Sequence, residues 1–376
     1  MLSVMAGVTV AMETTTEVDV GALPSNDTTD DVTSLNLQYV IWVFVLPVVL
    51  LVGIIGNILS IVVLQSKAFR HTTTGVCLPL TAIADSLFLL TGAQEILEIS
   101  GVFDVREYSV WSCRVYKVLH YSAGDASVWL LVAFTFDRFV AVCFPLSKRR
   151  VCKWKRAVIA SATILFLSLA KNLHEFWTRG PEYRKNGELR RVCGSQPQYQ
   201  FFLDYVRPWL VLVLIMAVPF VLILVFNCSI VGGLIKAKRV RDRTVSVCES
   251  TALSGTGNKP QTSASSGFRQ TTFMCLGISF AFLICMAPSI VLLIGKPYWK
   301  HRTNTAYSIS KAISNFLVFV NHSINFILYC VTGQRFRDEL KATLTCQQGR
   351  RGSQATTVGT PTPRSSQGLL REQTWT

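Results

Sequence analysis

The chain has 376 residues, a formal net charge of +15 at pH 7 and 50% hydrophobic residues. The hydrophobic residues come in long blocks, which is typical of a membrane protein and argues against a soluble domain. The basic residues lie between these blocks, where membrane topology places them, so the charge does not indicate nucleic-acid binding.

Seven apolar stretches are long enough to span a membrane, since about 20 helical residues cross a bilayer core of about 30 Å. In lipid each stretch must be a helix, because an open strand would leave backbone groups unpaired. We expect Pro219 and Pro288 to kink the helices that contain them. The expected spans are residues 39–64, 75–99, 113–143, 155–173, 205–235, 271–294 and 305–331. The sequence therefore predicts an all-α membrane protein, a seven-transmembrane helix bundle.

The distribution of charge predicts the orientation of the bundle. Residues 1–38 contain six acidic residues and no Lys or Arg, whereas basic residues follow spans one, three and five. The positive-inside rule then places the amino terminus outside the cell and the carboxyl terminus inside. The loop at 179–200 is also basic and disagrees, but the other loops outweigh it. Asn26 begins an Asn-Asp-Thr sequon, which predicts glycosylation of the outer tail.

Charged residues inside a span cost about 2.5–3.5 kcal/mol each, so they should face the bundle interior and have partners. Twenty-five residues separate Cys113 from Arg138, which corresponds to about 38 Å of helix. At about 100° per residue, His120 and Ser127 share a face with Arg138, whereas Asp125 does not. One interior face of span three therefore runs from an outer pocket to a cytosolic arginine. Asp125 is either a structural residue toward a neighbouring helix or a ligand contact.

Short motifs recur in a fixed order along the spans. They are Gly56-Asn57, Leu80 to Asp85, Cys113, Asp137-Arg138-Phe139, Cys193, Pro219, Phe282, Cys285, Pro288 and Asn325 to Tyr329. In this order and spacing the chain resembles the rhodopsin-like G-protein-coupled receptors over all seven spans. The chain departs from the family at Met286, where tryptophan is usual, at Phe326, where proline is usual, and at Asn227, where many members have tyrosine.

This resemblance implies a disulfide and a switch. Cys113 and Cys193 should form the disulfide that ties an outer loop to span three. The switch consists of Asp137, Arg138, Asn325 and Tyr329. In it, Asp137 holds Arg138 at rest, and outward movement of span six frees Arg138 for a heterotrimeric G protein. Arrestin is a further expected partner.

The resemblance also implies an ion site deep in the bundle. Asp85, Ser127, Asn321 and Asn325 match the family's sodium-binding cluster, and a buried carboxylate favours a cation with oxygen ligands. The alternative is a hydrogen-bonded polar network without an ion. No other metal or cofactor is expected.

Two positions narrow the class of ligand. Phe319 stands where opsins carry the retinal-binding lysine, and His120 stands where amine receptors carry an aspartate. Opposite charges near the pocket favour a peptide ligand. Residues 321–330, followed by Thr332-Gly333, resemble the span-seven signature of invertebrate FMRFamide-type and related neuropeptide receptors. The candidate ligand-binding residues are Glu95, Lys117, His120, Tyr121, Arg207 and Met286. Among them, Glu95 is expected to meet a basic or amidated peptide end.

Other classes of function fit less well. A seven-span transporter would show a repeated half with broken helices, and an enzyme would show a nucleophile–base set or metal-ligand spacing; neither pattern is visible in the sequence. An orphan or constitutively active receptor for a non-peptide ligand stays open. Replacing Arg138 should separate a coupled receptor from a non-signalling one.

Three segments are predicted on the cytosolic side of the membrane. Residues about 240–268 include a stretch rich in Ser, Thr and Gly and are expected to form a flexible inner loop. Residues 332–345 resemble the family's short amphipathic eighth helix, in which Phe336, Leu340 and Leu344 would face the membrane lipids. Cys346 is a candidate palmitoylation site, with an unmodified cysteine as the alternative. Residues 346–376 are expected to be a disordered cytoplasmic tail.

Overall fold

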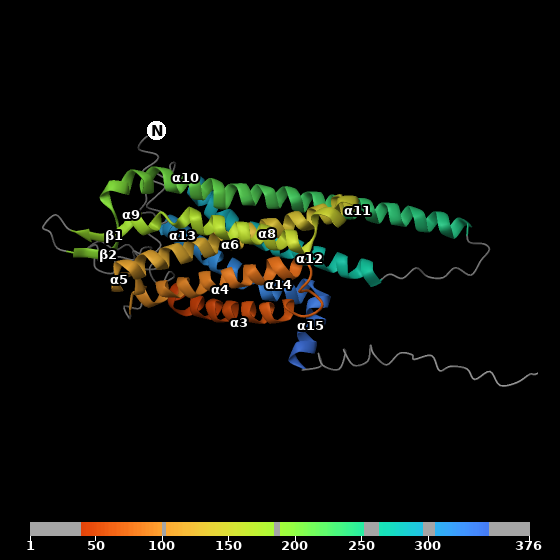
Figure 1. The fold of residues 1–376 in the computed structure, drawn as a ribbon, viewed down its shortest axis with the longest axis horizontal. Coiled ribbons are helices and arrows are strands. Elements are labelled where there is room, and N and C mark those ends of the chain that lie inside the picture. Colours follow the sequence, from red (N-terminus) through yellow and green to blue (C-terminus); the bar gives the residue numbers. More distant parts are fainter. Residues whose placement is uncertain (1–38, 100–102, 184–188, 252–262, 296–304, 346–376) are drawn as a thin grey trace, which may run out of the picture.

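The computed structural model describes residues 39–99, 103–183, 189–251, 263–295 and 305–345 as a bundle of long helices (Figure 1). Within these ranges, six helices are long and apolar enough to cross a membrane, and one bent pair makes a seventh. The predicted fold class is confirmed. The acidic tail with Asn26 and the tail that begins at Cys346 lie outside the described residues, so both modifications stay predictions.

Each predicted span coincides with a helix or a run of consecutive helices. The first to fourth are α3 (Leu46–Leu64) after a π-helical segment (Val40–Val45), α4 (Thr74–Ile99), α6 (Val110–Cys143) and α8 (Trp154–Asn172). The fifth joins Phe202–Val206, α10 (Arg207–Val211), Leu212–Ala217 and α11 (Val218–Thr251). The sixth is α12 (Ser263–Gly295), and the seventh is α13 (Thr305–Ser323) with α14 (Asn325–Thr332).

Shorter elements cover the two ends of the bundle. One end carries α5 (Val105–Tyr108), α9 (Glu175–Thr178) and an antiparallel hairpin of β1 (Arg179–Tyr183) and β2 (Leu189–Ser195). The opposite end carries α7 (Pro145–Val151) and α15 (Gln334–Leu344). In α15 Phe336 is buried against the bundle, so the predicted eighth helix is present but uses this side chain for packing.

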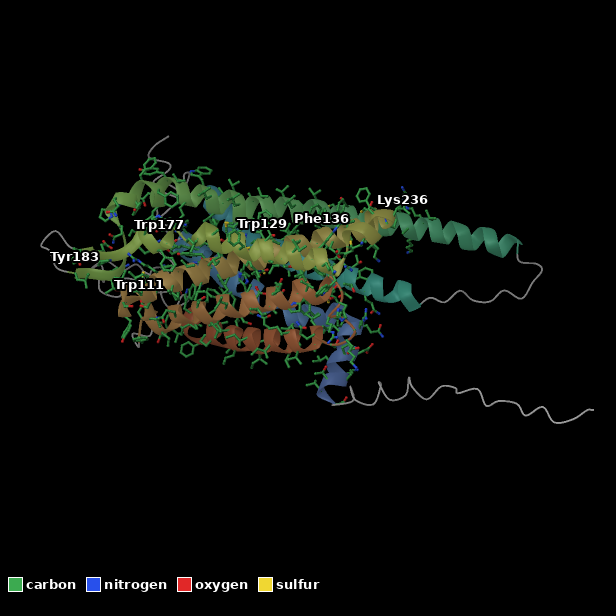
Figure 2. All side chains as sticks on the ribbon, viewed as in Figure 1. Trp111, Trp129, Phe136, Trp177, Tyr183 and Lys236 are labelled. Atoms are coloured by element: carbon green, nitrogen blue, oxygen red, sulfur yellow. A yellow bond between two sulfur atoms is a disulfide. The ribbon has the colours of Figure 1, made fainter. Side chains whose placement is uncertain are left out.

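Helix α6 forms the axis of the bundle. Its most apolar stretch is 67% buried, compared with 17% for the corresponding stretches of spans four and five. Exposed apolar side chains cover the outer helices, as a lipid-facing surface requires. Trp111, Trp177 and Tyr183 are exposed at the hairpin end and Lys236 lies toward the other end (Figure 2). Aromatic and basic residues of this kind mark the two interfaces of a membrane protein.

The non-helical connection between spans five and six is shorter than predicted. Helix α11 continues to Thr251 and α12 begins at Ser263, so helix replaces the expected flexible loop on both sides of residues 252–262. The sequence from 236 to 251 contains neither proline nor glycine, so nothing local ends the helix where it leaves the membrane.

Span seven bends by 55° where α13 meets α14. No proline lies at this bend, and Phe326 occupies the position where the family has one. Asn57 Nδ2 of α3 donates a hydrogen bond of 3.2 Å to the backbone oxygen of His322, directly before the bend. A side chain that bonds into the helix ladder is a recognised cause of a kink. Pro288 lies inside the continuous helix α12, whereas Pro219 is the second residue of α11, directly after the π-helical segment Leu212–Ala217.

Candidate functional site

A cavity of about 380 Å³ lies among the membrane-spanning helices toward the hairpin end. Its lining residues come from all seven spans, including Trp42 of the first, and from Arg106 of α5. They include five of the six predicted ligand-binding residues, Lys117, His120, Tyr121, Arg207 and Met286. The side chain of Glu95, the sixth, lies outside the described residues, and its role stays a prediction.

Two cations flank one aromatic ring in this cavity. Lys117 Nζ lies 5.7 Å from the centre of the Tyr121 ring, and the Arg207 guanidinium lies 4.6 Å from it. Both distances are within reach of a cation–π interaction. Lys117 forms no ion pair with a carboxylate among the described residues, whereas Arg207 does. Of these two cations, Lys117 is therefore the better placed to receive an acidic group of a ligand.

Arg207 is fixed by a buried carboxylate that the sequence analysis did not single out. Glu175 is fully buried in α9 and pairs with Arg179 Nε at 2.9 Å and Arg207 Nη2 at 3.1 Å. Arg179 begins strand β1 and also donates to Ser195 Oγ of β2 at 2.9 Å. Glu175 thus joins span four, the hairpin and span five. An acidic residue at the end of an apolar span was the sequence signal that could have identified it.

Replacing Glu175 with Gln should destabilise the receptor strongly. The change leaves two buried arginines facing a neutral amide, and breaking a buried ion pair in this way costs about 3–5 kcal/mol. We expect a large fall in the melting temperature of the purified receptor. Asp338→Asn, at an exposed position on α15, is the matched control and should leave the melting temperature nearly unchanged. Equal melting temperatures for the two variants would contradict this role of Glu175.

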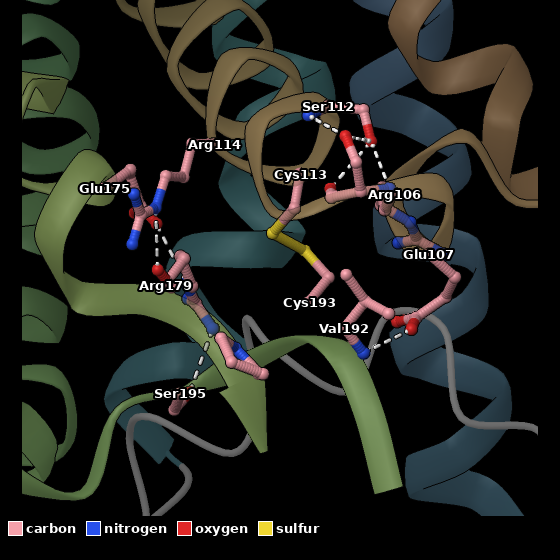
Figure 3. The surroundings of a disulfide bond; sticks show 12 residues. Arg106, Glu107, Ser112, Cys113, Arg114, Glu175, Arg179, Val192, Cys193 and Ser195 are labelled. Atoms are coloured by element: carbon pink, nitrogen blue, oxygen red, sulfur yellow. Dashed lines mark hydrogen bonds and ion pairs between the residues drawn. A yellow bond between two sulfur atoms is a disulfide. The ribbon is translucent and has the colours of Figure 1, made fainter. Parts of the chain in front are cut away.

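The hairpin is tied to α6 by the predicted disulfide between Cys113 and Cys193, whose Cα atoms are 5.4 Å apart (Figure 3). Arg114 Nε of α6 donates to the backbone oxygen of Arg179 at 3.0 Å, and the backbone amide of Val192 donates to Glu107 Oε2 of α5 at 2.6 Å. The hairpin is thus anchored to α5 and α6 beside the cavity.

Asp125 faces the neighbouring helix α8. Its carboxylate pairs with Lys171 Nζ at 2.8 Å and accepts a hydrogen bond from Asn172 Nδ2 at 2.7 Å. Both oxygen–nitrogen contacts join α6 to α8, as the structural interpretation of Asp125 predicts. Because the residue also borders the cavity, its role as a ligand contact stays a prediction. Lys171 is therefore neutralised where it meets the cavity.

Asp85 lies at the centre of a buried polar group that we call the Asp85 centre, consisting of Asp85, Ser127, His322 and Asn325. Ser127 Oγ donates to Asp85 Oδ1 at 2.5 Å, and Asn325 Nδ2 donates to Oδ2 at 2.7 Å. His322 Nδ1 lies 2.6 Å from Oδ1. Two of the residues predicted to cluster with Asp85 are therefore in place, whereas Asn321 forms no hydrogen bond with Asp85 in the described part of the chain.

The Asp137–Arg138 pair lies at the far end of α6 from the cavity. Arg138 Nε donates to Asp137 Oδ2 at 3.0 Å, and Arg138 Nη2 also contacts this oxygen. Thr73, directly before α4, accepts from Arg138 Nη2 and donates to Asp137 Oδ2, both at 2.9 Å. Asp137 and Thr73 together hold the buried guanidinium against α6 and the start of α4.

The other predicted switch residues lie elsewhere. Asn325 belongs to the Asp85 centre, and Tyr329 is buried with its ring 5.4 Å from that of Phe336 on α15.

The backbone of Asp137 is also contacted by a cysteine. The Cys152 thiol donates a hydrogen bond to the Asp137 backbone oxygen at 3.5 Å. Burial and the nearby Asp137 carboxylate raise the pKa of Cys152 to about 12, so this thiol stays protonated at neutral pH.

Comparison with known proteins agrees with this geometry. Residues 56–329 match the family described as 7 transmembrane receptor (rhodopsin family), which is well over half of the chain. The FMRFamide receptor of Drosophila melanogaster is 28% identical over 80% of this chain and 54% of its own length. The allatostatin-A receptor of Bombyx mori is 23% identical over 79% of this chain and 77% of its own. The pyrokinin-1 receptor of Drosophila melanogaster is 23% identical over 82% of this chain and 80% of its own length. This chain thus spans about half of the length of the Drosophila FMRFamide receptor.

Proposed function

Since the chain belongs to the rhodopsin family of seven-transmembrane receptors, we propose that it binds a peptide outside the cell and activates a heterotrimeric G protein at the plasma membrane. One observation carries the proposal. Helix α6 lines the cavity with Lys117, His120 and Tyr121 near one end and carries the Asp137–Arg138 pair near the other. A single rigid element therefore contacts both the ligand site and the proposed switch.

Activation in this proposal is a shift between two states. In the resting state Arg138 is bonded to Asp137 and Thr73. A ligand can favour the active state only if it binds that state more tightly. Release of Arg138 from these two partners would then present a guanidinium to the G protein. Arrestin is proposed as a second partner of the same surface, and α15 as the element that lies along the membrane lipids.

A peptide ligand is supported by the relatives and by the chemistry of the cavity. The three relatives above are named as receptors for FMRFamide, allatostatin-A and pyrokinin. Five cations line the described part of the cavity, of which Arg106, Lys171 and Arg207 pair with Asp104, Asp125 and Glu175. Lys117 forms no ion pair with a carboxylate among the described residues, so its charge is available to a ligand. This charge favours a ligand that carries an acidic group, which Lys117 would meet, whereas Glu95 was expected to meet a basic or amidated end.

A peptide library in cells that carry a promiscuous G protein tests this proposal. Each peptide should be offered as a matched pair, with a free carboxyl or an amidated end, to wild type and to the Lys117→Gln and Glu95→Gln variants. We expect at least one peptide to activate the wild type. Preference for the acid form, lost in Lys117→Gln, would assign Lys117; preference for the amide, lost in Glu95→Gln, would assign Glu95. A non-peptide activator, with no response to any peptide, would contradict the proposed ligand class.

A further inference from the structure

Three donor groups of the protein surround the Asp85 carboxylate, two at Oδ1 and one at Oδ2. Asp85 is fully buried, and both of its carboxylate oxygens accept: Oδ1 from Ser127 and His322, Oδ2 from Asn325. His322 donates to Oδ1 in the tautomer that carries its proton on Nδ1, because a carboxylate oxygen accepts through its lone pairs. A buried carboxylate with three donors is stabilised without a bound ion.

These partners do not fit the sodium ion that the family resemblance implies. A hard cation such as Na⁺ prefers several oxygen ligands. His322 has no side-chain oxygen, and its N–H group points at the carboxylate oxygen from 2.6 Å. Asn325 presents its amide nitrogen to Asp85, and Asn321 is not bonded to it. A cation beside Oδ1 would meet the positive end of the N–H dipole of His322.

His322 also separates the Asp85 centre from the cavity. The His322 side chain lines the cavity, whereas Asp85, Ser127 and Asn325 do not. Its ring lies 4.1 Å, centre to centre, from the Phe88 ring, and the Phe88 ring lies 4.5 Å from that of His120. Asn57 holds the backbone oxygen of His322 at 3.2 Å. The imidazole is therefore held in place between the ligand cavity and the carboxylate.

We propose that His322 takes the place of the sodium ion at Asp85, so that this receptor binds no Na⁺ there and its resting state does not depend on sodium. His322 is a positioning residue in this arrangement: it fixes Asp85 from one side and forms part of the cavity wall on the other. His120 and His322 both contact the Phe88 ring, and His322 contacts Asp85. A change in the cavity wall would therefore be transmitted to Asp85 by these packed rings rather than by a bound ion.

The test compares the melting temperature of the purified full-length receptor in NaCl and in choline chloride, each at about 0.15 M to equalise screening. A ligand that binds only the folded state raises the melting temperature as its concentration rises. We expect wild type to melt at the same temperature in both salts. His322→Ser supplies an oxygen and removes the ring, and this variant should gain a sodium-dependent rise that a second change, Asp85→Asn, abolishes.

His322→Asn is the second variant, to be used if the serine variant does not fold, and the same sodium-dependent rise is expected. A rise specific to sodium in wild type, lost in Asp85→Asn, would overturn the proposal. Absence of any sodium effect in both folded His322 variants would overturn the role of His322. The readout needs no ligand or G protein, so the result is independent of the proposed function.

Discussion

Replacement of Arg138 by alanine is expected to abolish most G-protein activation while leaving the receptor folded. Asp137 and Thr73 hold the polar end of the side chain, and its guanidinium lies 5.6 Å from the centre of the Phe134 ring. Hydrogen bonds to a charged group contribute about 1.5–3 kcal/mol each. Loss of one such bond to the G protein should reduce nucleotide exchange at least about tenfold. The measurement is nucleotide exchange on purified G protein with reconstituted receptor.

Thr73→Val is the matched variant, because it removes the hydroxyl that bonds both Asp137 and Arg138 and keeps the side-chain shape. We expect this variant to raise exchange in the absence of ligand, since the resting arrangement loses two hydrogen bonds while Arg138 remains. If Arg138→Ala exchanges nucleotide as fast as wild type, Arg138 has no role in coupling. If Thr73→Val lowers basal exchange, Thr73 does not restrain the resting state.

Loss of the disulfide should have the largest effect on stability and on ligand binding. Cys113 and Cys193 are 80 residues apart in the sequence. In the chain-entropy model a cross-link over such a loop contributes about 4–5 kcal/mol. The double variant Cys113→Ser/Cys193→Ser is therefore expected to melt at a much lower temperature. It should also bind peptide weakly, because the hairpin beside the cavity is freed from α6.

The free thiol of Cys228, which is exposed on the outer surface of α11, provides the control. Cys228→Ser removes one sulfur without cutting a cross-link and should change the free energy of unfolding by no more than about 0.5 kcal/mol. A double variant as stable as Cys228→Ser would contradict this expectation. It would show that the contacts of Arg114, Glu107 and Glu175 hold the hairpin without the disulfide.

The spans were predictable because their signal is local. Long apolar blocks correspond to the helices within a few residues, as for residues 113–143 and α6 (Val110–Cys143). The ends that leave the membrane were less predictable, since hydropathy stops at the lipid boundary and helix propensity does not. Helix α11 therefore continues to Thr251, well beyond the predicted end at 235.

The site was predictable where motifs are adjacent and less so where contacts are distant. Asp137 and Arg138 are neighbours, and their pairing follows from the motif. His322 lies 237 residues from Asp85, and no periodicity in the sequence places its ring on that carboxylate. An ionisable residue inside span seven was a signal in itself, because such residues are costly in lipid and need partners. Glu175 carried the same signal and was also missed.

The central claim is that peptide binding in the cavity and G-protein binding at Arg138 favour the same state of the receptor. The effect of each partner on the affinity for the other tests this claim most directly. The measurement is the affinity of an activating peptide with and without nucleotide-free G protein. Linkage requires that each partner raise the affinity for the other by the same factor, typically about 5–150-fold. We expect an increase in this range for wild type and none for Arg138→Ala. An unchanged peptide affinity in the presence of bound G protein would contradict the coupling of the two ends of α6.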